Sequence, residues 1–265
     1  MVCRLLAVPR STVLYSGQLT RDLSSLSVVI QTNLVTFPCF GLRRMYALLK
    51  RQRVACTRLN VRRVYVALKL LGKRAPPRLS TTNSRHEHPR HPNLACDLEV
   101  KRPDQLWVAD TLELKVAGRK AFLALVEDVY TRRVMGFGIG FRNDSLLTRA
   151  ALEMGLSRGR PEIHHSDQGT TYAALEYTKR LTKLGTMLSM AAVGRAWENG
   201  FAERLNKTFR EEEIMRSDYE TLQEARNSIA DYAKLYNQER IHQSLSYSTP
   251  NEVLKAHGQD QSEGL

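Results

Sequence analysis

The stretch that decides the fold reads QLWVADTLELKVAGRKAFLALVEDVYTRRVMGFGIGF and spans residues 105–141. Its apolar residues alternate from Leu106 to Leu114, run continuously from Phe122 to Val126, and alternate again from Arg133 to Phe141. Alternation has the period of a strand with one buried face, and a short continuous apolar run is typical of a fully buried strand. Residues 105–141 therefore predict three strands.

Downstream of these strands, helical patterns alternate with short strand patterns. Four helices are expected, from Asp144 or Ser145 to about Leu156, about Ala173 to Leu184, about Glu198 to Met215, and about Leu222 to Tyr236. Two short strands are expected at Pro161–His165 and Met187–Met190. Strands followed by helices that alternate with strands predict an α/β domain with a mixed sheet flanked by helices.

Upstream, residues 41–72 predict two amphipathic helices with a turn between them. Apolar residues fall at i, i+3, i+4 and i+7 in each helix: Leu42, Met45, Tyr46 and Leu49, then Val61, Val64, Tyr65 and Leu68. Asn60 is the expected N-cap of the second helix, and Gly72 stands where it would stop. This is the pattern of a helix-turn-helix within a small all-α region, residues 1–72. Further helical stretches are expected around Pro9, with Ser11 as a cap.

The charge of the chain is concentrated in its first part. The whole chain has 40 Lys+Arg and 27 Asp+Glu, a net charge of +13, and residues 1–100 hold 17 basic and only 4 acidic residues. Such an asymmetry favours a module that binds a polyanion. The helix pair has no acid and carries the candidate DNA contacts Arg43, Arg44, Arg58, Arg62 and Arg63, together with Lys50 and Lys69. A solvated helical hairpin is the alternative.

Residues 73–103 are predicted to be a Pro- and His-rich linker. They contain imidazole and thiolate groups that could bind zinc, at His86, His88, His91 and Cys96. Their spacing matches no closed zinc module, so a solvated linker is the favoured interpretation. The four cysteines form no CxxC pair, which fits reduced thiols in a cytoplasmic protein, and no apolar run approaches the length of a membrane span.

Three acids stand out by position. Asp110 lies among apolar residues of a predicted strand, Asp167 follows a short strand, and Glu203 lies on a predicted helix, with 35 residues between Asp167 and Glu203. Each alone could be a strand-edge, turn or surface acid. Together, carboxylates from two strands and a helix can hold a pair of hard divalent cations for an in-line phosphoryl transfer.

The sequence around each acid carries a family resemblance. Trp-x-x-Asp at 107–110, His-Ser-Asp-Gln-Gly at 165–169 and Glu-Asn-Gly-x-Ala-Glu at 198–203 resemble the D,D(35)E signature of the transposase and retroviral-integrase core. Pro-Asn-Leu at 92–94, Tyr-Asn-x-x-Arg-x-His-x-Ser-Leu at 236–245 and Thr-Pro-x-Glu at 249–252 are similar to segments of the second-frame (OrfB-type) proteins of two-frame insertion sequences, the IS-three family. The resemblance covers roughly residues 35–255.

The resemblance implies an RNase H-like catalytic core, here residues 104–255, followed by a tail at 256–265. It implies Asp110, Asp167 and Glu203 as catalytic acids and ligands of Mg²⁺ or Mn²⁺, two ions per site. The implied enzyme is a DNA transposase, a polynucleotidyl transferase that cleaves 3′ ends of the element and transfers them to target DNA. Lys207 and Arg210, at i+4 and i+7 from Glu203, are the implied DNA contacts of the core. The implied partners are double-stranded DNA, a first-frame OrfA-type protein or fusion, and further copies of the chain, at the bacterial nucleoid.

Two acids depart from the family pattern, and two other functions stay open. Glu198 stands where the family commonly has Asp, and it is a rival third ligand at a spacing of 30 residues from Asp167. Glu113 follows Asp110 by three residues and is expected on the opposite face of the strand. A decayed or regulatory DNA-binding protein, or an RNase H-like nuclease without joining activity, would share many of these features.

Overall fold

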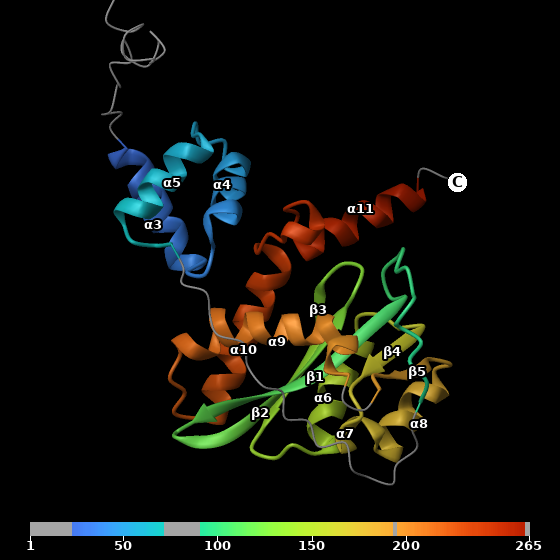
Figure 1. Ribbon diagram of the computed structural model, residues 1–265. Helices are drawn as coiled ribbons and strands as arrows, with labels where there is room; N and C mark the ends of the chain where they lie inside the picture. Colours follow the sequence, from blue (N-terminus) through green and yellow to red (C-terminus); the bar gives the residue numbers. More distant parts are fainter. Residues whose placement is uncertain (1–22, 72–90, 193–194, 263–265) are drawn as a thin grey trace, which may run out of the picture. The chain divides into compact units, whose positions relative to one another are not determined.

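The computed structural model of the chain describes residues 23–71, 91–192 and 195–262 (Figure 1). The chain divides into two compact units, Met1–Gly72 and Lys73–Leu265. The helical stretches expected around Pro9 and Ser11 lie outside the described residues, as do His86 and His88 of the linker. None of the helices in the described ranges combines the length and the apolar character needed to cross a membrane.

The described part of the first unit consists of three helices: α3 (Ser24–Thr36), α4 (Leu42–Arg51) and α5 (Arg58–Ala67). The expected apolar faces of α4 and α5 are confirmed at their centres, where Met45, Leu49, Val61, Val64 and Tyr65 are buried. The expected N-cap is wrong by three residues. The side chain of Thr57 accepts a hydrogen bond from the backbone N–H of Asn60, so α5 begins at Arg58 and Asn60 is its third residue.

The second unit is built on a five-stranded mixed sheet, which confirms the predicted fold class. Its strands are β1 (Leu106–Val116), β2 (Arg119–Asp128), β3 (Arg133–Gly140), β4 (Ile163–Ser166) and β5 (Met187–Met190). Their order is β3-β2-β1-β4-β5. The first three strands pair antiparallel, and β4 and β5 pair parallel to β1 and to each other. Strand β1 is therefore the central strand, with partners of both directions.

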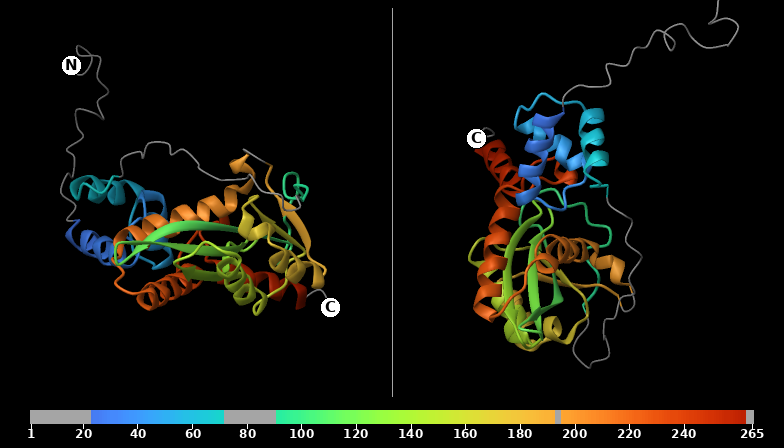
Figure 2. Two further views of the ribbon diagram at one scale, coloured as in Figure 1. Left: turned by 90° about the horizontal axis from the view of Figure 1, so that it is seen from below. Right: turned by 90° about the vertical axis from the view of Figure 1, so that its left-hand side faces the viewer.

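Helices cover both faces of this sheet (Figures 1 and 2). The helices of this unit are α6 (Ser145–Leu156), α7 (Thr170–Ala173), α8 (Leu175–Lys183), α9 (Gly200–Glu212), α10 (Leu222–Gln238) and α11 (Pro250–Ser262), with 3-10 turns at Ala196–Asn199, Ile214–Arg216 and Gln243–Leu245, and α11 packs on α10. Trp107 and Ala109 of β1 pack with α6 and α8, whereas Leu112 and Leu114 pack with α9 and α10. Helix α11 continues beyond residue 255 to Ser262, within the segment expected to be a tail.

Glycines of β3 allow α6 to approach the sheet closely. A Cβ atom at Gly136 would lie 2.1 Å from the carbonyl oxygen of Ala151, and one at Gly138 would lie 2.4 Å from that of Leu147. Both neighbours are backbone atoms of α6, which cannot move aside as a flexible side chain can. The glycines at 136 and 138 are therefore required by packing.

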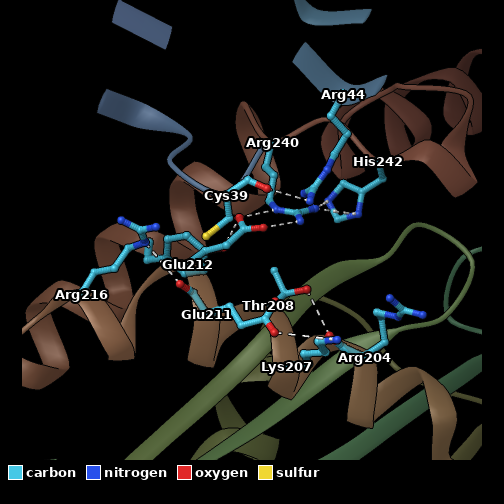
Figure 3. Close-up of polar contacts among 11 residues, drawn as sticks. Cys39, Arg44, Arg204, Lys207, Thr208, Glu211, Glu212, Arg216, Arg240 and His242 are labelled. Carbon is cyan, nitrogen blue, oxygen red and sulfur yellow. Dashed lines mark hydrogen bonds and ion pairs between the residues drawn. The ribbon is translucent and has the colours of Figure 1, made fainter. Parts of the chain in front are cut away.

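A buried ion pair joins the end of α9 to the segment after α10 (Figure 3). Arg240 donates to both carboxylate oxygens of Glu212 at 2.7 Å, and the hydroxyl of Tyr232 donates to the same carboxylate at 2.9 Å. Both charged side chains are less than a tenth exposed. The side chain of Asn237 also bonds both the N–H and the C=O of Val134 in β3. The motif at 236–245 thus fastens α10 to the sheet and to α9.

Candidate active site

Asp110 lies in the middle of β1, on the face of the sheet covered by α9. Its carboxylate accepts a hydrogen bond from the N–H of Thr111 at 2.7 Å and another from Nδ2 of Asn206 in α9 at 2.8 Å. Two fixed donors, one from the strand and one from the helix, hold the carboxylate in one orientation. This confirms that the acid is a partnered polar group inside a strand and no strand-edge residue facing water.

The electrostatic surroundings of Asp110 are unfavourable to its own charge. Burial, followed by the negative charge of Asp167 and then that of Glu203, raises the pKa of Asp110 to about 7, against the two hydrogen bonds. Burial also raises the pKa of Glu203. The fold therefore brings Asp167 and Glu203 within electrostatic reach of Asp110, although both are far from it along the chain.

Asp167 follows β4, the strand that pairs parallel with β1. Its Oδ1 accepts a hydrogen bond from the N–H of Gly169 at 2.9 Å, and the chain then turns into α7. The acid is thus a turn residue as well as a neighbour of Asp110. Its place at the carboxyl end of a parallel strand is where open α/β sheets bind ligands.

Glu203 lies in the first turn of α9 and is exposed. The same helix buries Ala202, Leu205, Phe209 and Glu212 on its other side. Lys207, one turn after Glu203, is exposed and forms an ion pair with Glu211 at 3.7 Å (Figure 3). Glu203 and Lys207 lie one turn apart on an exposed face of α9. A carboxylate in this position can bind a metal ion, and an ammonium group can bind a phosphate.

Asn206 is a site residue that the sequence pattern did not indicate. Its Nδ2 binds Asp110, while its Oδ1 is buried and has no hydrogen-bond partner. Asn199 has the same arrangement, since its Nδ2 donates to the carbonyl of Ala109 at 3.2 Å and its Oδ1 is unpartnered. Asn199 lies about one turn before Glu203 and Asn206 about one turn after it. Neither could be predicted as a site residue, because an uncharged polar side chain in a helical segment gives no sequence pattern that distinguishes it from its neighbours.

The rival acid Glu198 forms hydrogen bonds with residues other than the three acids. Its carboxylate accepts hydrogen bonds from Nδ2 of Asn93 and the N–H of Ala192, each at 2.8 Å. Glu113 is exposed and pairs with Lys120, and strand alternation places it on the opposite face of β1 from Asp110, as expected. The geometry therefore separates both extra acids from Asp110.

Within the described ranges, no group of three or more His, Cys, Asp or Glu side chains lies close enough together to hold a metal ion, and Asp110, Asp167 and Glu203 are no exception. The described members of the possible zinc set, His91 and Cys96, belong to no such group. The oxygen donors near Asp110 fit a hard divalent ion better than zinc. Such ions need only one or two protein carboxylates when water and substrate phosphates supply the rest.

The side chains predicted to contact DNA differ in their exposure to solvent and in their contacts within the protein. Arg43, Arg58, Arg62 and Arg63 are exposed on α4 and α5. Arg44 is half-buried; it donates to the carbonyl of Cys39 at 3.1 Å and stacks on the ring of Phe40 (Figure 3). On α9, Arg210 is half-buried and Lys207 exposed. Arg44 therefore stabilises its own unit, whereas the side chains of the other four predicted DNA contacts on α4 and α5 are exposed to solvent.

Two family models match the chain, and both describe an integrase core domain. One matches residues 100–196 and the other residues 184–250, so together they span the sheet and the helices that carry the three acids. The boundary between them falls between β4 and α9. Each model therefore includes one part of the site.

Known proteins from insertion elements resemble most of the chain. The transposase for insertion sequence element IS629 from Shigella sonnei is 28% identical over 220 residues, 82% of this chain and 74% of that protein. An uncharacterized 31 kDa protein of insertion element IS600 from the same species is 31% identical over 216 residues, 80% of this chain and 79% of that one. Among solved structures, the HTLV-2 integrase catalytic core in complex with magnesium aligns over 57% of this chain and 96% of that chain, with 19% identity and a TM-score of 0.47.

Proposed function

The chain belongs to the insertion-sequence transposases with an integrase core domain, and from that premise we propose that Asp110, Asp167 and Glu203 are its catalytic acids. It is thus a DNA transposase, and its reaction class is polynucleotidyl transfer. The observation that carries the proposal is the raised pKa of Asp110, which results first from burial and then from the charges of Asp167 and Glu203. Acids that disfavour one another's charge are suited to share a cation.

Integrase cores of this family depend on a divalent metal ion. We propose Mg²⁺ or Mn²⁺, two ions per site, with Asp110, Asp167 and Glu203 as ligands. When bound, such ions would activate the attacking oxygen and stabilise the leaving oxygen. The chain itself orients the ligands, since Thr111 and Asn206 fix Asp110 through the hydrogen bonds described above.

The proposed reaction has two steps at the same acids. Water first attacks the phosphodiester at the 3′ end of the element, and the freed 3′-OH then attacks a target phosphodiester. Each step exchanges one phosphorus–oxygen bond for another, so no external energy source is required. Lys207 and Arg210 on the Glu203 side of α9 would hold DNA phosphates, and Arg43, Arg58, Arg62 and Arg63 would bind DNA through α4 and α5.

We further propose that the transposase works as a multimer on DNA at the bacterial nucleoid, with a first-frame OrfA-type partner. A regulatory or decayed protein is the alternative, and so is a nuclease that only nicks. The described acids favour an active transferase, because a regulator has no use for a carboxylate whose pKa is raised by burial and by two other acids. The products decide between transfer and nicking.

The test compares wild type with Asp167→Asn, Glu203→Gln and Glu113→Gln on a labelled duplex of element-end sequence in Mn²⁺. Loss of the first two carboxylates should abolish both nicked and joined products, at least a thousandfold, because each removes a ligand charge. Glu113→Gln is the matched control and should cleave like wild type. Wild-type activity in Glu203→Gln would disprove the assignment of Glu203.

DNA binding is tested separately. All four proteins should bind the duplex equally in EDTA. Replacing Arg62 by Ala should weaken binding to every sequence and lower the slope of log affinity against log salt by about one unit. An unchanged slope would remove this arginine from the proposed phosphate contacts.

A further inference from the structure

The carboxylate of Glu198 is held by three donors just before α9. Nδ2 of Asn93 and the N–H of Ala192 each donate to its Oε2 at 2.8 Å, and Nη1 of Arg195 approaches its Oε1 at 3.4 Å. The side chain is only 7% exposed. The bond from Asn93 is the one that links this turn to a segment 105 residues earlier in the chain. Glu198 is therefore a bridge between distant segments.

The segment that contains Asn93 is itself fastened to the edge of the sheet. The N–H of Leu94 donates to Oγ of Ser189 at 2.8 Å, and the carbonyl of Pro92 accepts from the N–H of Met190 at 3.3 Å. The Oδ1 of Asn93 accepts from the N–H of Ala95 at 3.0 Å, which fixes the direction of its Nδ2. Pro-Asn-Leu at 92–94 is thus a rigid support for Glu198.

The same support reaches the strand that precedes Asp167. Oγ of Ser189 also bonds Nδ1 of His165 at 2.8 Å, and His165 is buried two residues before Asp167. Oγ of Ser189 thus accepts from the N–H of Leu94 and contacts the ring of His165 at the same time. Hydrogen bonds therefore connect the ends of β4 and β5 with residues 92–94.

We propose that the hydrogen-bonded pair Asn93 and Glu198, here called the latch, positions the first turn of α9 and so orients Glu203 toward Asp110 and Asp167. The inference rests on the proposed function, because it assigns positioning residues to the same site. Glu203 lies five residues after Glu198, and residues 191–199 connect β5 with α9. The same turn also contacts the sheet through Asn199, which bonds Ala109, and through the buried Ala202, and the guanidinium of Arg132 lies over the ring of Phe201.

The latch makes a specific kinetic prediction. Asn93→Leu removes the donor but keeps the size of the side chain, so the turn before α9 loses its link to residues 92–94. The rate of end cleavage at saturating DNA should fall at least tenfold, while the KM for DNA stays within twofold of wild type. Trypsin should cut after the exposed Arg195 several times faster in native protein, as followed by mass spectrometry of that one site.

A charge exchange provides the rescue. Asn93→Asp places a second carboxylate beside Glu198 and should lower the rate more than Asn93→Leu. Adding Glu198→Gln restores a donor and an acceptor with their roles reversed, and it should raise the rate at least threefold over Asn93→Asp alone. A mere loss of folding would not be repaired by a second substitution that removes a bonded carboxylate.

The matched control is Asn227→Leu, which removes one exposed hydrogen bond from Gln223 on α10. A rate for Asn93→Leu equal to that of the control, or a rise in KM alone, would overturn the latch. If wild type itself fails to cleave, the proposed function fails, and the trypsin experiment still decides the latch. Faster cutting after Arg195 then supports it, and unchanged cutting contradicts it.

Discussion

Two carboxylates at helix α9, one on the helix and one on the strand beneath it, differ in whether the fold neutralises their charge. Glu212, at the end of α9, receives two hydrogen bonds from the guanidinium of Arg240 and one from Tyr232. Asp110, opposite the middle of α9, receives two uncharged donors and faces the charges of Asp167 and Glu203. The chain therefore supplies a cation for Glu212, whereas the donors that it supplies for Asp110 are uncharged amides.

The difference shows how to separate structural charges from functional ones. A buried carboxylate paired with an arginine is fully compensated, and such pairs specify how elements fit together. A carboxylate whose neighbours raise its pKa destabilises the fold until something positive arrives. Charge that the fold does not neutralise is therefore an indicator of a site, and here it includes Asp110.

Breaking the compensated pair should have the largest effect. Arg240→Met leaves the carboxylate of Glu212 buried without a cation and should lower the free energy of unfolding by about 3–5 kcal/mol. Urea denaturation measures this loss. The double variant Glu212→Leu with Arg240→Met removes both charges and should recover most of it. A loss under about 1 kcal/mol in the single variant would mean that solvent already stabilises Glu212.

A third buried acid, Glu127 in β2, should make stability depend on pH. Its side chain is 3% exposed with Oε2 unpartnered, and burial, with a smaller contribution from Asp128, raises its pKa to about 8 despite Arg132. The unfolded chain ionises this group near pH 4.5, whereas the folded chain keeps it protonated to about pH 8. Stability should therefore fall as pH rises through this window, by up to about 1.4 kcal/mol per pH unit.

Glu127→Gln isolates that contribution. The amide cannot ionise, so the decline in unfolding free energy between pH 5 and pH 8 should be shallower than in wild type. Glu113→Gln, at an exposed position of the neighbouring strand, should leave the decline unchanged. Equal slopes for Glu127→Gln and wild type would show that Arg132 compensates the Glu127 charge after all.

Removing charge from the uncompensated acid should have the smallest effect on stability, and with the opposite sign. In metal-free buffer at pH 8, Asp110→Asn should raise the free energy of unfolding by about 1 kcal/mol, because repulsion from Asp167 and Glu203 disappears. The unpartnered Oδ1 of Asn206 can then accept from the new amide. Calorimetry in EDTA measures the gain, and a lower melting temperature than wild type would contradict the contrast with Glu212.

Added Mg²⁺ should sharpen the same contrast. Wild type should gain more thermal stability from the ion than Asp110→Asn does, because only wild type has the charge that the ion compensates. Arg240→Met should gain as much as wild type from the ion, since the Glu212 pair lies outside the proposed metal site. Equal gains for wild type and Asp110→Asn would remove Asp110 from the proposed ligands.

The sequence predicted the sheet and the three acids because both leave a periodic or spaced signal. Alternation around residues 106–114 marked the central strand, and a carboxylate inside it was conspicuous at Asp110. The N-cap of α5 was misplaced because Thr57 and Asn60 are both good caps, and only the hydrogen bond at Thr57 distinguishes them. Local signals thus located elements better than their ends.

The supporting contacts could not be predicted in the same way. Asn206 looks like any polar helical residue, and its role depends on α9 crossing β1 at Asp110. Glu212 and Arg240 look like surface charges until the fold buries them together. Asn93 and Glu198 are separated by 105 positions, and no period connects them. These roles are properties of tertiary packing, which the chain specifies only as a whole.

The packing of residues 91–100 on the sheet bears on how the catalytic core can be produced as a fragment. Ala95, Leu98 and Val100 cover Leu106 and Val108 of the central strand, and Asn93 reaches the turn before α9. A recombinant fragment that starts at the first strand would expose this apolar surface to water and invite aggregation. A fragment that starts a few residues before Pro92 keeps these apolar side chains packed on the strand. Its first residue then lies within the segment that composition alone predicts to be a linker.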